Sequence, residues 1–118
     1  MKVLFVLNDP PYGTERSYNG LRMAHALGKH TENAEITVFL MADAVLCAKK
    51  GQKTPDGFYN LEHMLARVLS SARNKVLLCG TCMNARGLSD MEIVEGARRS
   101  TMDELADLTL AAEKVLVF

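Results

Sequence analysis

The sequence predicts an α/β fold in which helices cover both faces of a mainly parallel β-sheet. Short apolar runs alternate along the chain with segments of helical period, and the runs lack the polar alternation of half-exposed strands. The apolar runs are "KVLFVLN" (2–8), "AEITVFLM" (34–41), "NKVLLCG" (74–80) and "EKVLVF" (113–118). Because parallel neighbours need long connections, we expect right-handed crossovers between these strands.

Two long helices are predicted between the first three strands. Residues 15–30 are rich in small side chains, which suit close packing against a sheet. Residues 59–73, "YNLEHMLARVLSSAR", carry apolar residues at three- and four-residue spacing, which is typical of an amphipathic helix. The residues of that stripe are Leu61, Met64, Leu65, Val68, Leu69 and Ala72.

Capping signals predict two further helices near the end of the chain. Ser89 and Glu92 have the spacing of a capping box, and so do Thr101 and Glu104. The first pair predicts a short helix, and the second predicts that the last helix begins near residue 100 or 101. The residues that we expect this last helix to turn inward are Met102, Leu105, Ala106, Thr109 and Ala112.

Length and charge limit what the protein can do. A chain of 118 residues is long enough to form a single domain, here residues 1–118, without disulfides or a structural metal. Lysine plus arginine and aspartate plus glutamate number 14 each, so nucleic acid and anionic membranes are not expected partners. The first apolar stretch stops at Asn8, which argues against a signal peptide, and no segment approaches the roughly 20 apolar residues of a membrane span. We therefore expect a soluble cytoplasmic protein with reduced thiols.

Two loops are expected at the carboxyl ends of strands, where open α/β sheets bind their ligands. In the first, "NDPPYGTER", Gly13 permits a turn and Thr14 can cap the following helix. Together with Asp9 and Tyr12 these residues could face a ligand or a partner, or the loop could simply connect strand to helix. It lacks the glycine spacing and the lysine of a P-loop, so no nucleotide site is predicted.

The second loop, "CGTCMNARG", carries two cysteines. Cys79 directly follows an apolar run, and "TCMNAR" is short enough for one or two helical turns closed by Gly87. The sulfur of Cys79 should then face backbone N–H groups, an arrangement that, with Arg86 as a nearby cation, favours a nucleophilic thiolate. Cys82, one turn further on, could resolve a persulfide or a mixed disulfide on Cys79.

Other interpretations of these residues stay open. A strand-terminal cysteine is often only a small buried hydrophobe, although the C-x-x-C spacing favours reactivity. Arg86 could instead bind a helix carbonyl or a neighbouring acid, while Gly80 and Thr81 would line the site. No metal or cofactor is expected, because the remaining candidate ligands lie far apart in sequence. Those ligands are Cys47, which we expect to be packed, and His25, His30 and His63.

At these residues the sequence resembles the DsrE/DsrF-like family of small sulfur-relay proteins, almost from end to end. The opening strand with "PPYGTE", the segment "CGTCMNARGL" and the closing "STMDELADLTLAAEKVLVF" carry the similarity. The resemblance implies a three-layer α/β/α sandwich around a mainly parallel sheet of about five strands. It also implies trimers, hexamers or hetero-oligomers, and a strand-end cysteine, here Cys79, that carries sulfane sulfur as a persulfide.

These observations leave three candidate functions. In the first, the protein is a possible sulfurtransferase that takes sulfur from a donor protein onto Cys79 and passes it to an acceptor thiol. In the second, Cys79 and Cys82 cycle between dithiol and disulfide, as C-x-x-C sites at strand-to-helix junctions do. In the third, the cysteines only pack, and the protein is a non-catalytic oligomeric scaffold or binding domain.

Overall fold

The computed structural model describes all 118 residues and contains one five-stranded sheet. The strand order is β4-β3-β2-β1-β5, and every neighbouring pair is parallel, which confirms the predicted fold class. The strands are β1 (Lys2–Leu7), β2 (Glu35–Leu40), β3 (Lys75–Cys79), β4 (Arg98–Ser100) and β5 (Lys114–Val117). Four of them lie on the four apolar runs.

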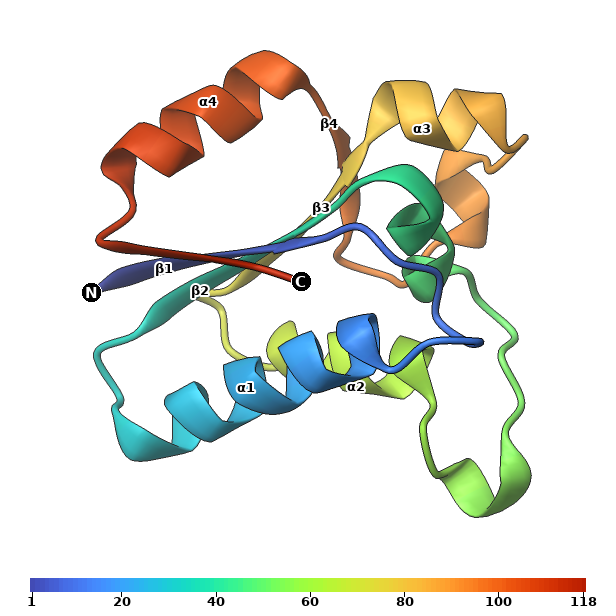
Figure 1. Ribbon diagram of the computed structural model, residues 1–118, viewed down its shortest axis with the longest axis horizontal. Coiled ribbons are helices and arrows are strands. Elements are labelled where there is room, and N and C mark those ends of the chain that lie inside the picture. Colours follow the sequence, from blue (N-terminus) through green and yellow to red (C-terminus); the bar gives the residue numbers. More distant parts are fainter.

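Helices form a layer on each side of the sheet (Figure 1). α1 (Arg16–His30) and α2 (Leu61–Val68) cover one face, and α4 (Met102–Ala111) covers the other. The short α3 (Gly80–Ala85) follows β3 without a loop, so it stands at the carboxyl end of the strands. Single 3-10 segments occupy Ala42–Ala48, Pro55–Gly57 and Asp90–Glu92.

The core has two unequal parts because successive side chains of a strand point to opposite faces. Val3, Phe5 and Leu7 of β1 belong to a large cluster under α1 and α2, whereas Leu4 and Val6 belong to a small cluster under α4. Both faces of the central strands are thereby buried, which is why their sequences show apolar runs without alternation.

The second helix is shorter than the expected 59–73. It ends at Val68, and the hydroxyl of Ser70 donates to the carbonyl of Arg67 at 2.6 Å. Asn74 then accepts from the N–H of Ile36 at 2.9 Å and donates to the carbonyl of Val68 at 3.0 Å. Side chains thus satisfy the carbonyls of Arg67 and Val68, which another turn of α2 would have used, and Asn74 also ties the chain to β2 just before β3 begins.

The strand β4 had no sequence signal. Its three residues, "RRS", include no apolar side chain, and it forms because it pairs with β3 in the register Leu77↔Arg98, Leu78↔Arg99 and Cys79↔Ser100. The short helix predicted before it is present as the segment Asp90–Glu92. Its capping box of Ser89 and Glu92 is made in both directions.

The last helix begins where the capping signal predicted. The N–H of Glu104 donates to the hydroxyl of Thr101 at 3.1 Å. The predicted inward face was partly wrong: Leu105 is buried and Ala112 is half-buried, but Met102, Ala106 and Thr109 are exposed. Since α4 lies alone on its face of the sheet, it touches the strands along a narrow line only.

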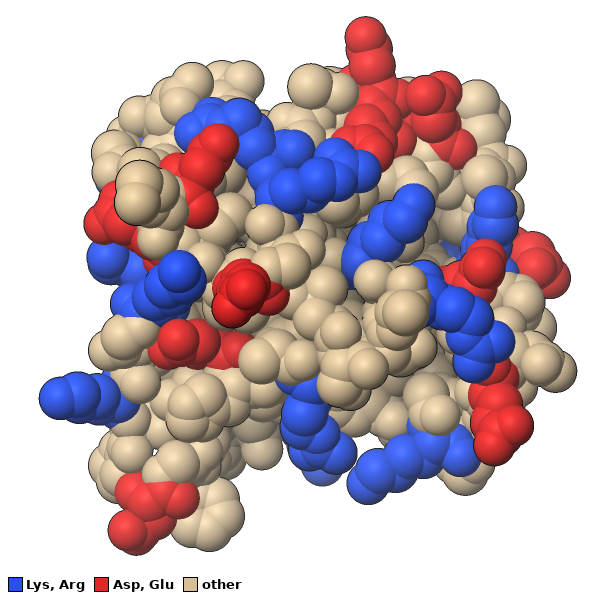
Figure 2. All heavy atoms as spheres, turned by 180° about the vertical axis from the view of Figure 1, so that it is seen from behind, with Lys and Arg blue, Asp and Glu red and all other residues tan.

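The surface carries charges of both signs. Figure 2 shows Lys and Arg interspersed with Asp and Glu over the face seen from behind. Several ion pairs join opposite charges, including Arg98 with Glu104 at 2.6 Å and Arg99 with Asp90 at 2.9 Å. None of the helices combines the length and the apolar character needed to span a bilayer.

Candidate functional site

Cys79 stands where β3 becomes α3. It is the last residue of the strand and the N-cap of the helix, and its Sγ accepts a hydrogen bond from the N–H of Cys82 at 3.4 Å. The helix ends after Ala85, and Gly87 follows with a φ of 62°. The strand-end position, the short helix and the N–H that faces the sulfur agree with the prediction.

The sulfur of Cys82 also accepts a hydrogen bond from a backbone N–H. The amide of Ala42, which follows the carboxyl end of β2, donates to the Sγ of Cys82 at 3.2 Å. Ala42 has a φ of 50°, in the left-handed region that an alanine rarely adopts, at a cost of about 1–2 kcal/mol. This backbone conformation is part of what aims an N–H at the sulfur.

Burial and the neighbouring Cys79 both affect the titration of Cys82. Burial raises the pKa of the Cys82 thiol, and the hydrogen bond that it shares with Cys79 raises it further. The N–H of Ala42 and the more distant cation of Arg86 act in the opposite direction, but they do not outweigh these two effects. Cys82 therefore keeps its proton to higher pH than an ordinary thiol.

Both cysteines open onto one surface hollow of about 680 Å³. Each is only partly buried, so the Cys79 sulfur is not sealed among the aliphatic side chains that it also contacts. Gly80 and Thr81 line the hollow, as we expected from their place between the cysteines. The other lining residues are Met41, Asn84, Arg99, Ser100, Thr101 and Met102.

Four of the ten residues that line this hollow come from a region that sequence reasoning did not assign to the site. Arg99, Ser100, Thr101 and Met102 reach the cysteines only because β4 pairs with β3. Thr101 carried a capping signal, but nothing in "ARRS" indicated a strand. The pairing of Cys79 with Ser100 places the start of α4 beside the loop that carries the two cysteines.

Arg86 binds a neighbouring acid and a helix carbonyl, which was one of its two predicted roles. Its Nε donates to Asp43 at 2.9 Å, and its Nη1 donates to the carbonyl of Cys82 at 3.1 Å. These bonds join the end of α3 to the Ala42–Ala48 segment. Arg86 is not among the residues that line the hollow.

The loop after β1 does not line the hollow of Cys79 and Cys82, although the backbone carbonyl of Asp9 accepts from the Sγ of Cys47 at 3.8 Å. The backbone carbonyl of Asp9 accepts from Ser17 at 2.7 Å, and its carboxylate accepts from Thr14 at 3.1 Å. The hydroxyl of Tyr12 donates to Gln52 at 2.5 Å, and Gly13 turns the chain with a φ of 100°. These contacts hold the loop to α1 and to the segment around Gln52. It borders a separate hollow with the rings of Tyr18 and Tyr59, whose centroids lie 4.2 Å apart.

Cys47 is fully buried, as predicted. Burial raises the pKa of its thiol to about 12, so this cysteine is inert at neutral pH. No three His, Cys, Asp or Glu side chains lie close enough together to hold a metal ion.

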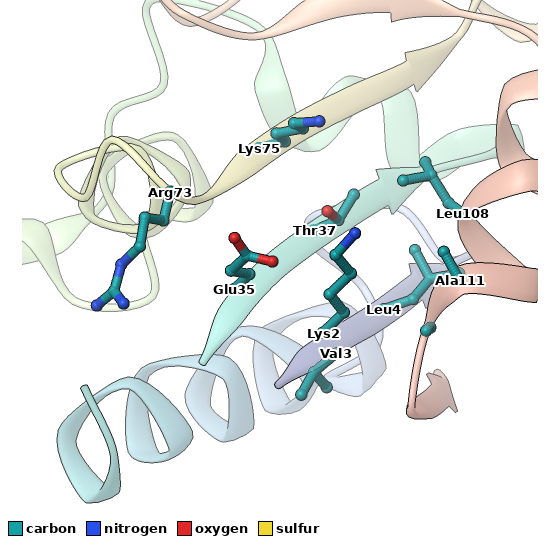
Figure 3. Close-up of a pocket in the computed structure, with 10 residues that line it drawn as sticks. Lys2, Val3, Leu4, Glu35, Thr37, Arg73, Lys75, Leu108 and Ala111 are labelled. Carbon is teal, nitrogen blue, oxygen red and sulfur yellow. The ribbon is translucent and has the colours of Figure 1, made fainter. Parts of the chain in front are cut away.

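Another hollow, of about 170 Å³, lies at the opposite end of the strands (Figure 3). Lys2, Glu35 and Thr37 project into it from the first residues of β1 and β2, and Leu108 and Ala111 of α4 form its apolar side. It contains no cysteine and no histidine. Cys79 and Cys82 therefore lie at the other, carboxyl edge of the sheet.

Comparison with known proteins agrees with this architecture. The family model described as DsrE/DsrF-like matches residues 1–118. The chain belongs to the DsrE/DsrF-like family. YchN of Escherichia coli is 42% identical over 117 residues, which cover 99% of this chain and 98% of YchN. Protein MJ0989 of Methanocaldococcus jannaschii is 35% identical over 118 residues, which cover 100% of both chains.

Solved structures share the fold. The crystal structure of YchN superposes with a TM-score of 0.93 at 40% identity, covering 100% of this chain and 99% of that one. The structure of protein MTH1491 from Methanobacterium thermoautotrophicum gives a TM-score of 0.79 at 13% identity, with 99% and 98% coverage, and shows the fold alone.

The coupling of the two thiols predicts how Cys82 titrates. Replacing Cys79 by alanine removes the shared hydrogen bond, so the pKa of Cys82 should fall toward its ordinary value. At a fixed pH below both pKa values, Cys82 should therefore be alkylated several-fold faster in Cys79→Ala than in the intact protein, because the rate follows the thiolate fraction. Residue-resolved alkylation against pH measures this, with the buried Cys47 as an unlabelled internal control. An unchanged or higher midpoint in Cys79→Ala would contradict the coupling.

Proposed function

We propose that the protein carries sulfane sulfur as a persulfide on Cys79, which makes it a sulfur-relay protein of sulfurtransferase type. The observation that supports this most is the placement of a partly exposed thiol at the carboxyl end of a central strand. A backbone N–H faces its sulfur, and an open hollow lies next to it. Family membership across the whole chain supports the same assignment.

The transfer needs two displacement steps. In the first, the Cys79 thiolate attacks the terminal sulfur of a donor persulfide R–S–SH, the donor S–S bond breaks, and R–S⁻ leaves. Cys79–S–SH has then formed with no net oxidation. In the second, an acceptor thiolate attacks that terminal sulfur and regenerates the Cys79 thiolate. The partners are a donor and an acceptor protein, and no cofactor takes part.

The surroundings of Cys79 fit a reaction that needs no strong general base. Hydrogen bonds from Arg98 and Ser100 lower the pKa of Glu104 to about 2, and this carboxylate lies outside the hollow, whose lining contains no Asp, Glu or His. The N–H of Cys82 instead donates a hydrogen bond to the Cys79 sulfur. Displacement on a persulfide proceeds through the thiolate fraction of the attacking thiol and needs no partner base.

Cys82 determines whether the persulfide survives. If its thiolate attacked the inner sulfur of Cys79–S–SH, a Cys79–Cys82 disulfide would form and HS⁻ would leave. The raised pKa of Cys82 keeps it protonated and slows that discharge. The same proximity of two thiols favours the second candidate function, a dithiol–disulfide oxidoreductase, which requires both residues.

Serine substitutions distinguish the two candidates. A carrier loses sulfur loading in Cys79→Ser, while Cys82→Ser still loads and holds its persulfide longer, because the discharging thiol is gone. Incubation with a persulfide donor followed by trapping and peptide mass mapping measures both. Loss of reaction in both variants to the same extent would favour the dithiol couple. Absence of loading in the intact protein would contradict the carrier.

Self-association is a further prediction, supported by apolar side chains left exposed on α4 and β5. Leu110 is 86% exposed, and Met102, Val115 and Val117 are also uncovered. Large apolar side chains left exposed in this way are often covered by a second subunit. We expect the intact protein to sediment as a trimer or hexamer and Leu110→Glu to sediment as smaller species. A monomeric intact protein at micromolar concentration would contradict this prediction.

A further inference from the structure

We propose that Arg99 binds an anionic group of the sulfur donor or acceptor, so that the hollow selects partners with a carboxylate or similar anion beside the reacting sulfur. This inference rests on the proposed sulfur transfer at Cys79. It concerns a residue outside the cysteine loop, which enters the site through the pairing of β4 with β3.

The guanidinium of Arg99 is fixed by contacts on two of its nitrogens. Nε donates to Asp90 at 2.9 Å, and Nη1 donates to the carbonyl of Gly80 and to Oδ1 of Asn84, both at 2.9 Å. Nη2 makes no hydrogen bond within the protein. A side chain held in this way has already lost most of its rotational freedom, so its unused N–H groups bind a ligand at low entropic cost.

Arg99 also lies next to the reactive loop. A Cβ built on Gly80 would meet Cγ of Arg99 at 2.9 Å, so the stem of the arginine packs directly on the residue that follows Cys79. A larger residue at position 80 would have to displace this stem. The absence of a side chain on Gly80 therefore allows Arg99 to lie against the residue that follows Cys79 and to line the same hollow.

Arg99 supplies the charge of the residues that line the hollow. No Asp or Glu lines the hollow, and Arg99 is its only charged lining residue. Its partner Asp90 has a side chain that is 66% exposed, so water screens that ion pair strongly. The neighbouring Arg98 is paired with Glu104 and stays outside the lining. The hollow thus carries one positive charge.

A guanidinium with free N–H groups prefers planar anions such as carboxylates. A substrate anion bound there would place its sulfur near Cys79 and would raise the local concentration of anionic over neutral reactants. For a partly exposed charge we expect a selectivity of about three- to tenfold.

Two alkylating reagents of similar size measure this selectivity. Iodoacetate and iodoacetamide both transfer their carbon to the Cys79 sulfur with loss of iodide, and they differ in charge. The measured quantity is the ratio of their rate constants at Cys79, divided by the same ratio for a small free thiol. We expect a normalised ratio above one that falls with added salt and falls by about three- to tenfold in Arg99→Gln.

Arg98→Gln is the matched control, because it removes the same charge from the adjacent residue outside the hollow, and its ratio should stay near that of the intact protein. Arg99→Lys should keep part of the selectivity, and circular dichroism verifies that each variant is folded. The proposal would be overturned if the intact protein gave a normalised ratio of one or less that did not fall with added salt. This outcome does not depend on whether Arg99→Gln folds. An equal loss of selectivity in Arg98→Gln would overturn the proposal as well.

The failure of the two proposals looks different in this experiment. If Cys79 loads sulfur and reacts with both reagents without charge selectivity, only the role of Arg99 is lost. If Cys79 reacts with neither reagent, the sulfur carrier itself is contradicted.

Discussion

The parallel pairing of β3 with β4 is the contact on which the site depends. Three residue pairs form it, and the last of them places Ser100 beside Cys79. Without that pairing, Cys79 would still accept a backbone N–H at the β3–α3 junction, but residues 99–102 would not line the hollow beside it. Because β4 leads directly into α4, the same contact also positions the helix that covers the second face of the sheet.

The sulfurs of Cys79 and Cys82 line the same hollow but have different environments. Cys79 lies at the end of the strand and accepts one N–H, whereas Cys82 lies a turn later against the backbone of Ala42. Burial and the shared hydrogen bond raise the pKa of Cys82, so the pair is not two equivalent nucleophiles. This asymmetry suits a carrier that must hold a persulfide until an acceptor arrives. The left-handed conformation of Ala42 belongs to the same arrangement.

Much of this could be predicted from the sequence because the relevant signals are local. The apolar runs gave four strands, the capping residue Thr101 gave the start of α4, and the position of Cys79 directly after "VLL" gave the strand-end thiol. β4 could not be predicted, because its pairing energy comes from a neighbour distant in sequence and its residues are polar. Arg99 was missed for the same reason. The contact between Ala42 and Cys82 depends on a backbone angle that no residue pattern indicates.

The central claim is that Cys79 carries sulfur in the cell. The most direct measurement is mass spectrometry of the protein isolated rapidly from its native cells, with alkylation at lysis to trap persulfides and peptide mapping of all three cysteines. We expect the mass of one extra sulfur atom on the peptide of Cys79 and its absence from that of the buried Cys47. Unmodified Cys79 in cells whose other persulfides are preserved by the same procedure would contradict it.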